Sequence, residues 1–284
     1  MTQKKVVKVH ITEPENHLDN VDDNLIRNRK EINESLKYAS YIQKAILPSP
    51  LTLKRSIPEH FLIFMPKDIV SGDFYFLAHK KDQVYIAVAD CTGHGVPGAF
   101  MSIMGLTFLS EIIHHGSFSS ASSVLNHMRE KVMKAMQQTG DDEEQKDGID
   151  IALCIINSET NKLNYAGAFN PIYIVKKNRL LEIQGDKMPI GIAADEENPF
   201  TDHYCDLDEG DLVYFFTDGF VDQFGGPNGK KFKYQPFRSL ILTLSSLPIH
   251  KQKEKLIEIF NAWKGNLPQL DDVLMLGLRY HRNN

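Results

Sequence analysis

The sequence has few cysteines, one tryptophan and no excess of basic side chains. Its three cysteines form no Cys-x-x-Cys pair, and its eleven histidines form no His-x-x-x-His pair. These absences argue against a zinc site and against a disulfide framework. With an odd number of cysteines, reduced thiols in a cytosolic protein are the natural expectation. The net charge of −5 provides no broad attraction for nucleic acid or for an anionic membrane surface.

Long apolar runs and two common ligand-binding motifs are also missing. No run approaches the length of a membrane span, and Met1–Lys5 leads into no apolar leader segment. We therefore expect a cytoplasmic protein with no membrane and no nucleic acid as partner. Gly93–Gly98 lacks the following Lys and Ser/Thr of a phosphate-binding P-loop. No Asp-x-Asp-x-Asp-Gly spacing of a calcium-binding EF-hand occurs either.

What is present divides the chain into three parts. A hydrophobic fraction of 42% over 284 residues is enough for one large domain with an appendage. Residues 1–23 are polar and of mixed charge, which predicts a flexible arm. Residues 24–50 contain neither Gly nor Pro before Pro48 and predict a linker or dimerisation helix. Residues 51–284 then form the domain.

The helix predicted over 25–47 repeats apolar residues every seven positions, at Leu25, Ile32, Ala39 and Ile46. Leu36 and Ile42 fill the same side. Such a seam pairs with another helix, which predicts a homodimer or a contact with a helix of an upstream sensor or other partner. An amphipathic helix that lies on its own domain explains the pattern equally well.

Short apolar runs alternate with turn residues through the domain. Strands are predicted at 61–65, 73–77, 84–89, 149–157, 162–166, 172–176, 179–183, 212–217 and 273–278, and helices at 98–115, 119–138, 235–247 and 250–263. The turn-like links between 149 and 183 predict an antiparallel meander. A helix pair inside a series of mostly antiparallel strands predicts an α+β fold with sheets covered by helices.

The stretch Ala89–Phe100 reads Ala-Asp-Cys-Thr-Gly-His-Gly-Val-Pro-Gly-Ala-Phe, and it follows the buried strand predicted at 84–89. Its glycines let the backbone turn sharply and approach a ligand closely. Asp90 stands where that strand ends, and a carboxylate there needs a positive partner. No Lys or Arg occurs in the loop.

Acidic residues recur at strand ends, at Asp73, Asp218 and the pair Asp271–Asp272. Any one of them could be a solvated turn aspartate, but the set favours a single folded site. Aspartate oxygens are hard ligands suited to Mg²⁺ or Mn²⁺. Two such ions about 3.5–4 Å apart can share a carboxylate and activate a water for in-line attack on phosphate, without a Ser or Cys nucleophile.

These motifs resemble those of the metal-dependent (PPM-type) serine/threonine phosphatases. The matching segments are Gly72–Tyr75, Ala89–Ala99, Thr217–Gly219 and Asp271–Asp272. The chain is most similar to the bacterial branch typified by the stage II sporulation protein E phosphatase domain and the stress-response sigma-factor regulators. The resemblance covers roughly residues 55–281. It implies an αββα sandwich, in which helices flank two antiparallel sheets and the metals lie at one edge.

The resemblance also implies a role for each acid. Asp90 matches the carboxylate that bridges two ions, beside the backbone carbonyl of Cys91. Asp218 and Asp271 match ligands of one ion, and Asp73 matches the acid that holds the other ion directly or through water. On this basis Asp90 and Asp218 are the catalytic candidates.

Four further residues are weaker candidates. Asp272 stands where the wider family often has Asn, which favours a supporting role. Asp150 either contacts a loosely held third ion or simply begins a strand. His94 lies four residues after the bridging acid rather than two, which favours a hydrogen bond within the loop over proton transfer. Lys67 is the nearest candidate for holding substrate phosphate, although an exposed lysine beside a proline explains it as well.

The expected function is hydrolysis of phosphoserine or phosphothreonine on a regulatory protein, such as an anti-sigma-factor antagonist. The alternative is a catalytically inactive phosphatase fold that serves as a binding module. An inactive copy is expected to lose at least one of Asp73, Asp90, Asp218 and Asp271, and this chain keeps all four.

Overall fold

The computed structural model describes residues 17–116, 118–138, 147–192 and 198–282, and two antiparallel sheets form its centre. Apolar residues alternate with turns throughout this part, which favours strands that pack face to face. The first sheet has the order β1-β12-β9-β6-β7, with β1 His60–Met65, β12 Val273–Arg279, β9 Leu212–Phe216, β6 Ile172–Lys176 and β7 Arg179–Ile183. The second has the order β2-β3-β4-β5-β8, with β2 Phe74–Lys80, β3 Gln83–Cys91, β4 Ile149–Asn157, β5 Lys162–Ala168 and β8 His203–Asp206.

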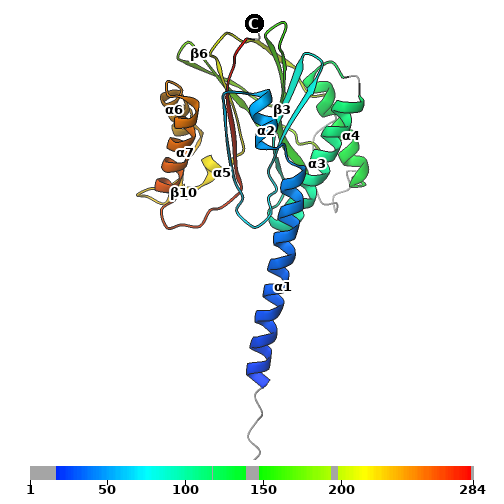
Figure 1. Ribbon diagram of the computed structural model, residues 1–284, viewed down its shortest axis with the longest axis vertical. Coiled ribbons are helices and arrows are strands. Elements are labelled where there is room, and N and C mark those ends of the chain that lie inside the picture. Colours follow the sequence, from blue (N-terminus) through cyan, green and yellow to red (C-terminus); the bar gives the residue numbers. More distant parts are fainter. Residues whose placement is uncertain (1–16, 117, 139–146, 193–197, 283–284) are drawn as a thin grey trace, which may run out of the picture.

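Helices cover the outer faces of both sheets (Figure 1), as an αββα sandwich requires. The second sheet is covered by α3 Gly95–His115 and α4 Ala121–Ala135. The first is covered by α6 Tyr234–Leu244 and α7 Ile249–Lys264, beside the short helix α5 Gly219–Asp222 and the hairpin of β10 Phe224–Gly225 and β11 Lys230–Lys231. The α+β class and the two helix-flanked antiparallel sheets are confirmed.

The hydrophobic core has two parts. One lies between the sheets and under α3 and α4, where Phe74, Ile86 and Leu153 are almost inaccessible to solvent. The other lies between the first sheet and its helices and contains Phe216 and Phe237, whose ring centroids are 5.0 Å apart. Burial of these side chains holds the four layers together, because it removes large apolar areas from water.

The antiparallel meander predicted over 149–183 is wrong. β4 does pair with β5, but β5 pairs next with β8, whereas β6 joins the other sheet between β9 and β7. The chain changes sheets at Phe169–Pro171, where Phe169 adopts a positive φ of 54°. Two successive hairpins therefore look continuous in the sequence although they belong to different sheets.

Helix α3 corrects a second expectation. By length and composition alone it is apolar enough to cross a membrane, although we found no such run in the sequence. Half of its apolar window is buried against the rest of the molecule, and Leu109 and Ile112 lie in the core. The helix is apolar because it is packed between β2, β3 and α4.

Helix α1 (His17–Ile46) projects from the sandwich as a stalk (Figure 1). It begins inside the segment predicted as an arm, and residues 1–16 lie outside the described residues. Only its last turns meet the domain, where Ser40 and Gln43 are buried against α3 and the loop before β2. The short helix α2 (Pro50–Ser56) follows, with Ser49 as its N-cap.

Candidate metal centre

Aspartates from both sheets meet at one end of the sandwich. Asp73 directly precedes β2, Asp90 lies at the end of β3, and Asp150 stands opposite Asp90 in the register of β3 and β4. From the other sheet, Asp218 follows β9 and caps α5, and Asp271 precedes β12. Antiparallel pairing brings these ends together because the start of one strand lies beside the end of its neighbour.

Asp73 is the most deeply buried member, with 1% of its surface exposed. It accepts a hydrogen bond of 2.8 Å from the hydroxyl of Thr217. The hydroxyl oxygen of Thr217 in turn accepts a bond from the backbone N–H of Leu274. Thr217 follows β9 of the first sheet and Asp73 precedes β2 of the second, so the bond between them joins the two sheets. Burial, followed by the charges of Asp90 and Asp272, raises the pKa of Asp73 well above its ordinary value.

Asp272 holds the loop that leads to Asp73. One of its carboxylate oxygens accepts a bond of 2.7 Å from the backbone N–H of Lys67, and the other accepts one of 2.7 Å from Gly72. A side chain at Gly72 would clash, because its Cβ would lie 2.8 Å from the carbonyl oxygen of Gly93. These contacts give Asp272 the supporting position that the sequence predicted.

Asp90 borders a cavity of about 220 Å³. The cavity is lined by Asp90, Cys91, Thr92, Gly93, His94, Asp150 and Asp271. The pKa of Asp90 is raised well above its ordinary value, first by burial and then by the negative charges of Asp218, Asp271, Asp150 and Asp272. Like charges disfavour one another's ionised forms only at short range. The effect of four other aspartates on Asp90 therefore shows that their carboxylates lie close to it.

Two neighbours of Asp90 titrate near neutral pH. Burial and the charge of Asp218 raise the pKa of Asp150 to about 7. Burial, Asp222 and Asp271 raise the pKa of Asp218 to about 6, against a lowering effect of Lys231. Asp150 also lines the same cavity as Asp90 and Asp271.

His94 lies at the rim and contacts a residue outside the cluster. Its Nδ1 is 2.8 Å from a carboxylate oxygen of Asp68, and both side chains are about half exposed. This contact ties the Asp90 loop to the loop before β2, as expected for a hydrogen bond that stabilises the loop. The thiol of Cys91, by contrast, is buried, and burial together with the neighbouring carboxylates raises its pKa.

The donor set fits divalent cations. Within the described ranges, no Lys, Arg or His forms an ion pair with Asp73, Asp90, Asp150, Asp218, Asp271 or Asp272, and Lys231 pairs with Asp222 instead. Among the same residues no three acidic, Cys or His side chains form a ready-made metal cage. Mg²⁺ does not need one, because it usually keeps several waters and takes one or two carboxylates. The backbone carbonyl of Cys91 is a further oxygen donor.

Comparison with known proteins places this arrangement in a family. The family described as Stage II sporulation protein E (SpoIIE) matches residues 80–281. The chain belongs to the SpoIIE family. It is 23% identical over 203 residues to the phosphoserine phosphatase RsbU of Bacillus subtilis (strain 168), a match that covers 68% of this chain and 55% of RsbU. The chain thus spans about half the length of that relative.

Solved structures agree with this assignment. The SiaA-PP2C domain of Pseudomonas aeruginosa superposes with a TM-score of 0.80 at 30% identity, covering 89% of this chain and 99% of that domain. RsbX in complex with magnesium has the same fold at 15% identity, with a TM-score of 0.55 and coverage of 78% and 94%. The resemblance to the bacterial phosphatase branch is confirmed.

Sequence reasoning missed several residues of this SpoIIE-family site. Thr217 was known only as part of a motif, and its bond to Asp73 joins residues 144 positions apart. The contacts of Gln43 with Ser71 and of Asp68 with His94 were also not predicted. Tyr234, at the start of α6, was also missed; burial, Asp218 and Asp222 raise its pKa to about 12. Lys67 is half-buried, and its amine bonds to no residue in the described part of the chain.

Proposed function

We propose that this SpoIIE-family domain is a metal-dependent phosphatase that hydrolyses phosphoserine or phosphothreonine on a regulatory protein. The observation that carries the proposal is the cluster of mutually repelling aspartates with no paired cation in the described structure. It is supported by the similarity to a phosphoserine phosphatase. An inactive binding module is not favoured, because selection on binding alone would not keep such an acid cluster.

We assign two ions, Mg²⁺ or Mn²⁺, to Asp73, Asp90, Asp218, Asp271 and the carbonyl of Cys91. Bound there, the ions would supply Lewis-acid activation of a water and neutralise phosphate charge. Asp90 would hold both ions, and Thr217 fixes the orientation of Asp73. Asp150, which faces Asp90 across the β3–β4 ladder, is the candidate for a weakly held third ion.

The substrate is a phosphorylated regulatory protein, and an anti-sigma-factor antagonist is one candidate. The segment Gly225–Phe232, which contains the turn between β10 and β11 and all of β11, follows the Asp218 helix and is suited to select the substrate. Cytoplasmic action is consistent with the free thiols of Cys91, Cys154 and Cys205. We expect neither nucleic acid nor membrane as a partner.

The stalk is proposed to pair with a second copy or with the helix of an upstream sensor. On α1, Ile32 has 60% of its surface exposed to solvent, and Ile42 and Ile46 each have 44% exposed. The side chain of Leu25 lies outside the described residues. A helix that lay along its own domain would cover these side chains, whereas the described residues of α1 that are buried are Ser40 and Gln43, near its end.

The proposal is tested by measuring hydrolysis of p-nitrophenyl phosphate and of a phosphoserine peptide. Each substrate is assayed with Mn²⁺, with Mg²⁺ and with a chelator. Activity should require the metal, and Asp271→Asn should lower it at least about tenfold, because even residues that only support metal ligands contribute 10- to 100-fold. Asp206→Asn is the matched control, because Asp206 is exposed on β8. Hydrolysis that persists in chelator, or an unchanged Asp271→Asn, would contradict the metal assignment.

A further inference from the structure

A second cavity lies at the opposite end of the sandwich from the aspartates. It has a volume of about 430 Å³ and opens between the two sheets, where the β2–β3 turn, the end of β4, the end of β12 and the end of α2 meet. β3 runs from this end to the aspartates and has 9 residues, so the sites are roughly 25 Å apart along the strand. We call this cavity the end pocket. Its volume is in the range typical of small-molecule sites.

The floor of the end pocket is apolar. Ile57, Ile86 and Leu278 line it and are at least 95% buried. Val84 also lines it, two residues before Ile86 on β3, so both side chains lie on the face of that strand that meets the other sheet. A ligand with an apolar body would remove this floor from water, which favours binding in proportion to the area covered.

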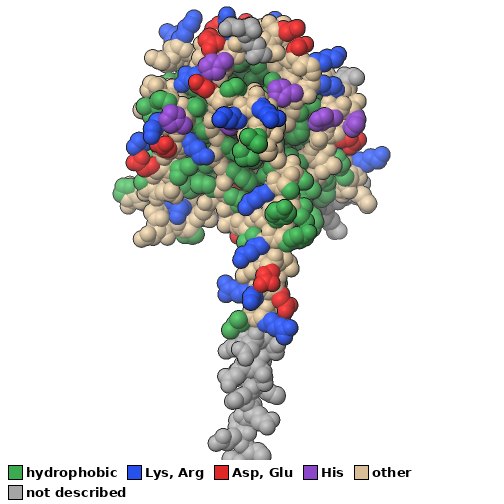
Figure 2. Space-filling model, in the orientation of Figure 1, with side chains coloured by type: hydrophobic (Ala, Val, Ile, Leu, Met, Phe, Trp, Pro, Cys, Tyr) green, Lys and Arg blue, Asp and Glu red, His purple; other side chains and the backbone are tan. Residues whose placement is uncertain are grey.

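Basic side chains form the rim of the end pocket. Arg55, His79, Lys81 and His281 line it, and Asp82 is the one acidic residue among its lining. Figure 2 shows Lys, Arg and His side chains gathered around exposed hydrophobic ones on the face that carries α2. An anion would therefore meet complementary charge at this opening.

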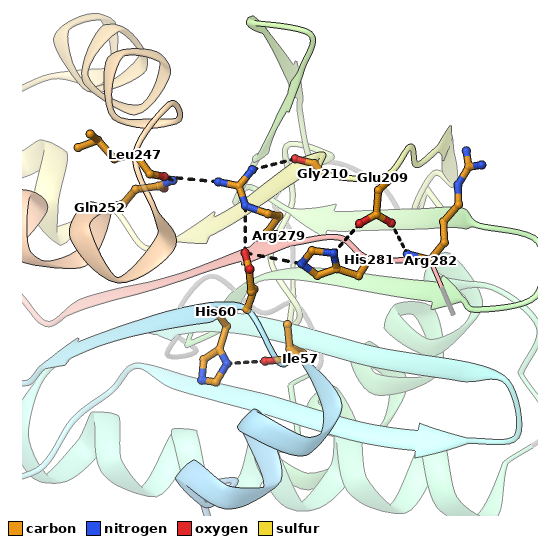
Figure 3. Close-up of polar contacts among 10 residues, drawn as sticks. Ile57, His60, Glu209, Gly210, Leu247, Gln252, Arg279, His281 and Arg282 are labelled. Atoms are coloured by element: carbon orange, nitrogen blue, oxygen red, sulfur yellow. Dashed lines mark hydrogen bonds and ion pairs between the residues drawn. The ribbon is translucent and has the colours of Figure 1, made fainter. Parts of the chain in front are cut away.

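Some of the basic side chains that line the pocket, which also include Arg279, are already engaged and some are not. Arg279 bonds to Glu59 at 3.0 Å and to the carbonyl of Gly210, and His281 lies 2.6 Å from a carboxylate oxygen of Glu209 (Figure 3). Within the part of the chain that the structure describes, Arg55, His79 and Lys81 form no hydrogen bond or ion pair through their side chains. These three are free to contact a ligand.

The turn that carries Lys81 sets its backbone conformation. Lys81 occupies the two-residue turn between β2 and β3 with φ of 54°, a conformation that Gly and Asn adopt more easily. A lysine there is less favourable for folding than Asn or Gly.

We propose that the end pocket binds a small anionic amphiphile, namely a carboxylate on an aliphatic chain. The apolar floor takes the chain, and Arg55 and Lys81 take the carboxylate as charge-assisted hydrogen-bond donors. A cationic ligand would meet only Asp82, and an anion without an apolar part would leave the floor in contact with water.

Calorimetric titration of the purified chain with octanoate, below its micelle concentration, tests this assignment. We expect saturable one-to-one binding of octanoate and at least tenfold weaker binding of octyltrimethylammonium, acetate and inorganic phosphate. The double variant Arg55→Gln, Lys81→Asn should bind octanoate at least tenfold more weakly. Equal binding of the cationic and anionic amphiphiles, or no octanoate binding, would overturn the proposal.

Two controls separate this test from folding and from phosphatase activity. Lys177→Asn makes the same substitution at a similar turn with φ of 47° outside the end pocket, and it should leave octanoate binding unchanged. Asp90→Asn should also bind octanoate normally, because Asp90 lies at the other end of the sandwich. If the double variant unfolds at the same temperature as the wild type and still binds octanoate equally well, Arg55 and Lys81 do not form the site.

Discussion

At the scale of single residues, the candidate centre is a set of carboxylates that destabilise one another. Asp90 shows this most clearly, because burial and four neighbouring aspartates all raise its pKa. A folded protein keeps such a group ionised only with a compensating positive charge. The described side chains provide none at Asp90, which is why metal binding and stability should be coupled here.

Asp90→Asn should abolish metal-dependent hydrolysis while the fold stays intact. The amide cannot supply the charge that two ions share, so we expect a loss of at least about 100-fold, beyond what supporting residues contribute. In chelator at pH 7.5 the variant should unfold at a higher temperature than the wild type. The reason is that a raised folded-state pKa makes the ionised wild-type Asp90 increasingly unfavourable as the pH rises. Near-normal turnover with Mn²⁺ would refute the assignment.

Cys91→Ser should keep most of the activity. Burial and nearby carboxylates raise the pKa of this thiol, so the nucleophilic thiolate is disfavoured, and the proposed contribution of Cys91 is its backbone carbonyl. Steady-state hydrolysis and alkylation by a thiol reagent check this. Complete loss of activity in Cys91→Ser with metal still bound would indicate a covalent mechanism instead.

The sequence could predict the acids but not their partners. Asp73, Asp90, Asp218 and Asp271 are visible because each stands beside a turn at the end of an apolar run. The bond between Thr217 and Asp73 joins segments distant in the chain, and no local pattern encodes it. The contact of His94 with Asp68 across 26 positions is hidden for the same reason.

At the scale of elements, runs of strand-forming residues predicted where strands lie better than which strands pair. β6 and β7 have the predicted bounds, yet they belong to a different sheet from β4 and β5. The turn at Phe169 directs the chain from one sheet to the other. The place beside β5 is taken by β8, a short strand of partly exposed residues whose sequence has no apolar run. The spacing of apolar residues predicts which side of a strand is buried, but it does not predict which element covers that side.

The junction of α1 with the domain leads to a prediction about Gln43. Its amide donates to the carbonyl of Ser71 at 2.6 Å and accepts from the N–H of the same residue at 3.1 Å. Ser71 stands two residues before Asp73, so Gln43 couples the stalk to a proposed metal ligand. Gln43→Leu should leave the N–H of Ser71 unpaired and its carbonyl with only the 3.2 Å bond from the hydroxyl of Ser102, which lowers stability by about 1–3 kcal/mol. We expect activity to fall about tenfold as well.

Gln252→Leu is the matched control for this prediction. Gln252 is equally buried and makes two hydrogen bonds, with the hydroxyl of Tyr214 and the carbonyl of Leu247. It lies on α7, which covers the other sheet, so its loss should lower stability to a similar extent and leave hydrolysis per folded molecule unchanged. Thermal unfolding and metal-dependent turnover of both variants, side by side, decide the point. Equal activity of the two would show that Gln43 is only a structural contact.

At the scale of the whole molecule, α1 and the aspartates lie at the same end of the sandwich, and the C-terminal end of β12 lies at the other (Figure 1). The seven-residue apolar spacing could not show whether the helix lies on the domain or leaves it, because both arrangements need one apolar face. In the structure, the helix projects away from the domain (Figure 1). At 30 residues, α1 is about 45 Å long, and Gln43 connects its end to the loop of Asp73.

A stalk that ends on the loop of a proposed metal ligand suggests that pairing of the stalk and activity change together. Replacing Ile32 and Leu36 by Asp places two charges on the seam, and we expect sedimentation velocity to show a shift towards monomer with altered metal-dependent turnover. Three or four heptads associate only modestly, so the shift should depend on protein concentration. The control Asn33→Asp, Lys37→Gln makes the same change in net charge away from the seam and should behave like the wild type. If the seam variant sediments and hydrolyses substrate like the wild type across that range, the stalk does not pair through this face.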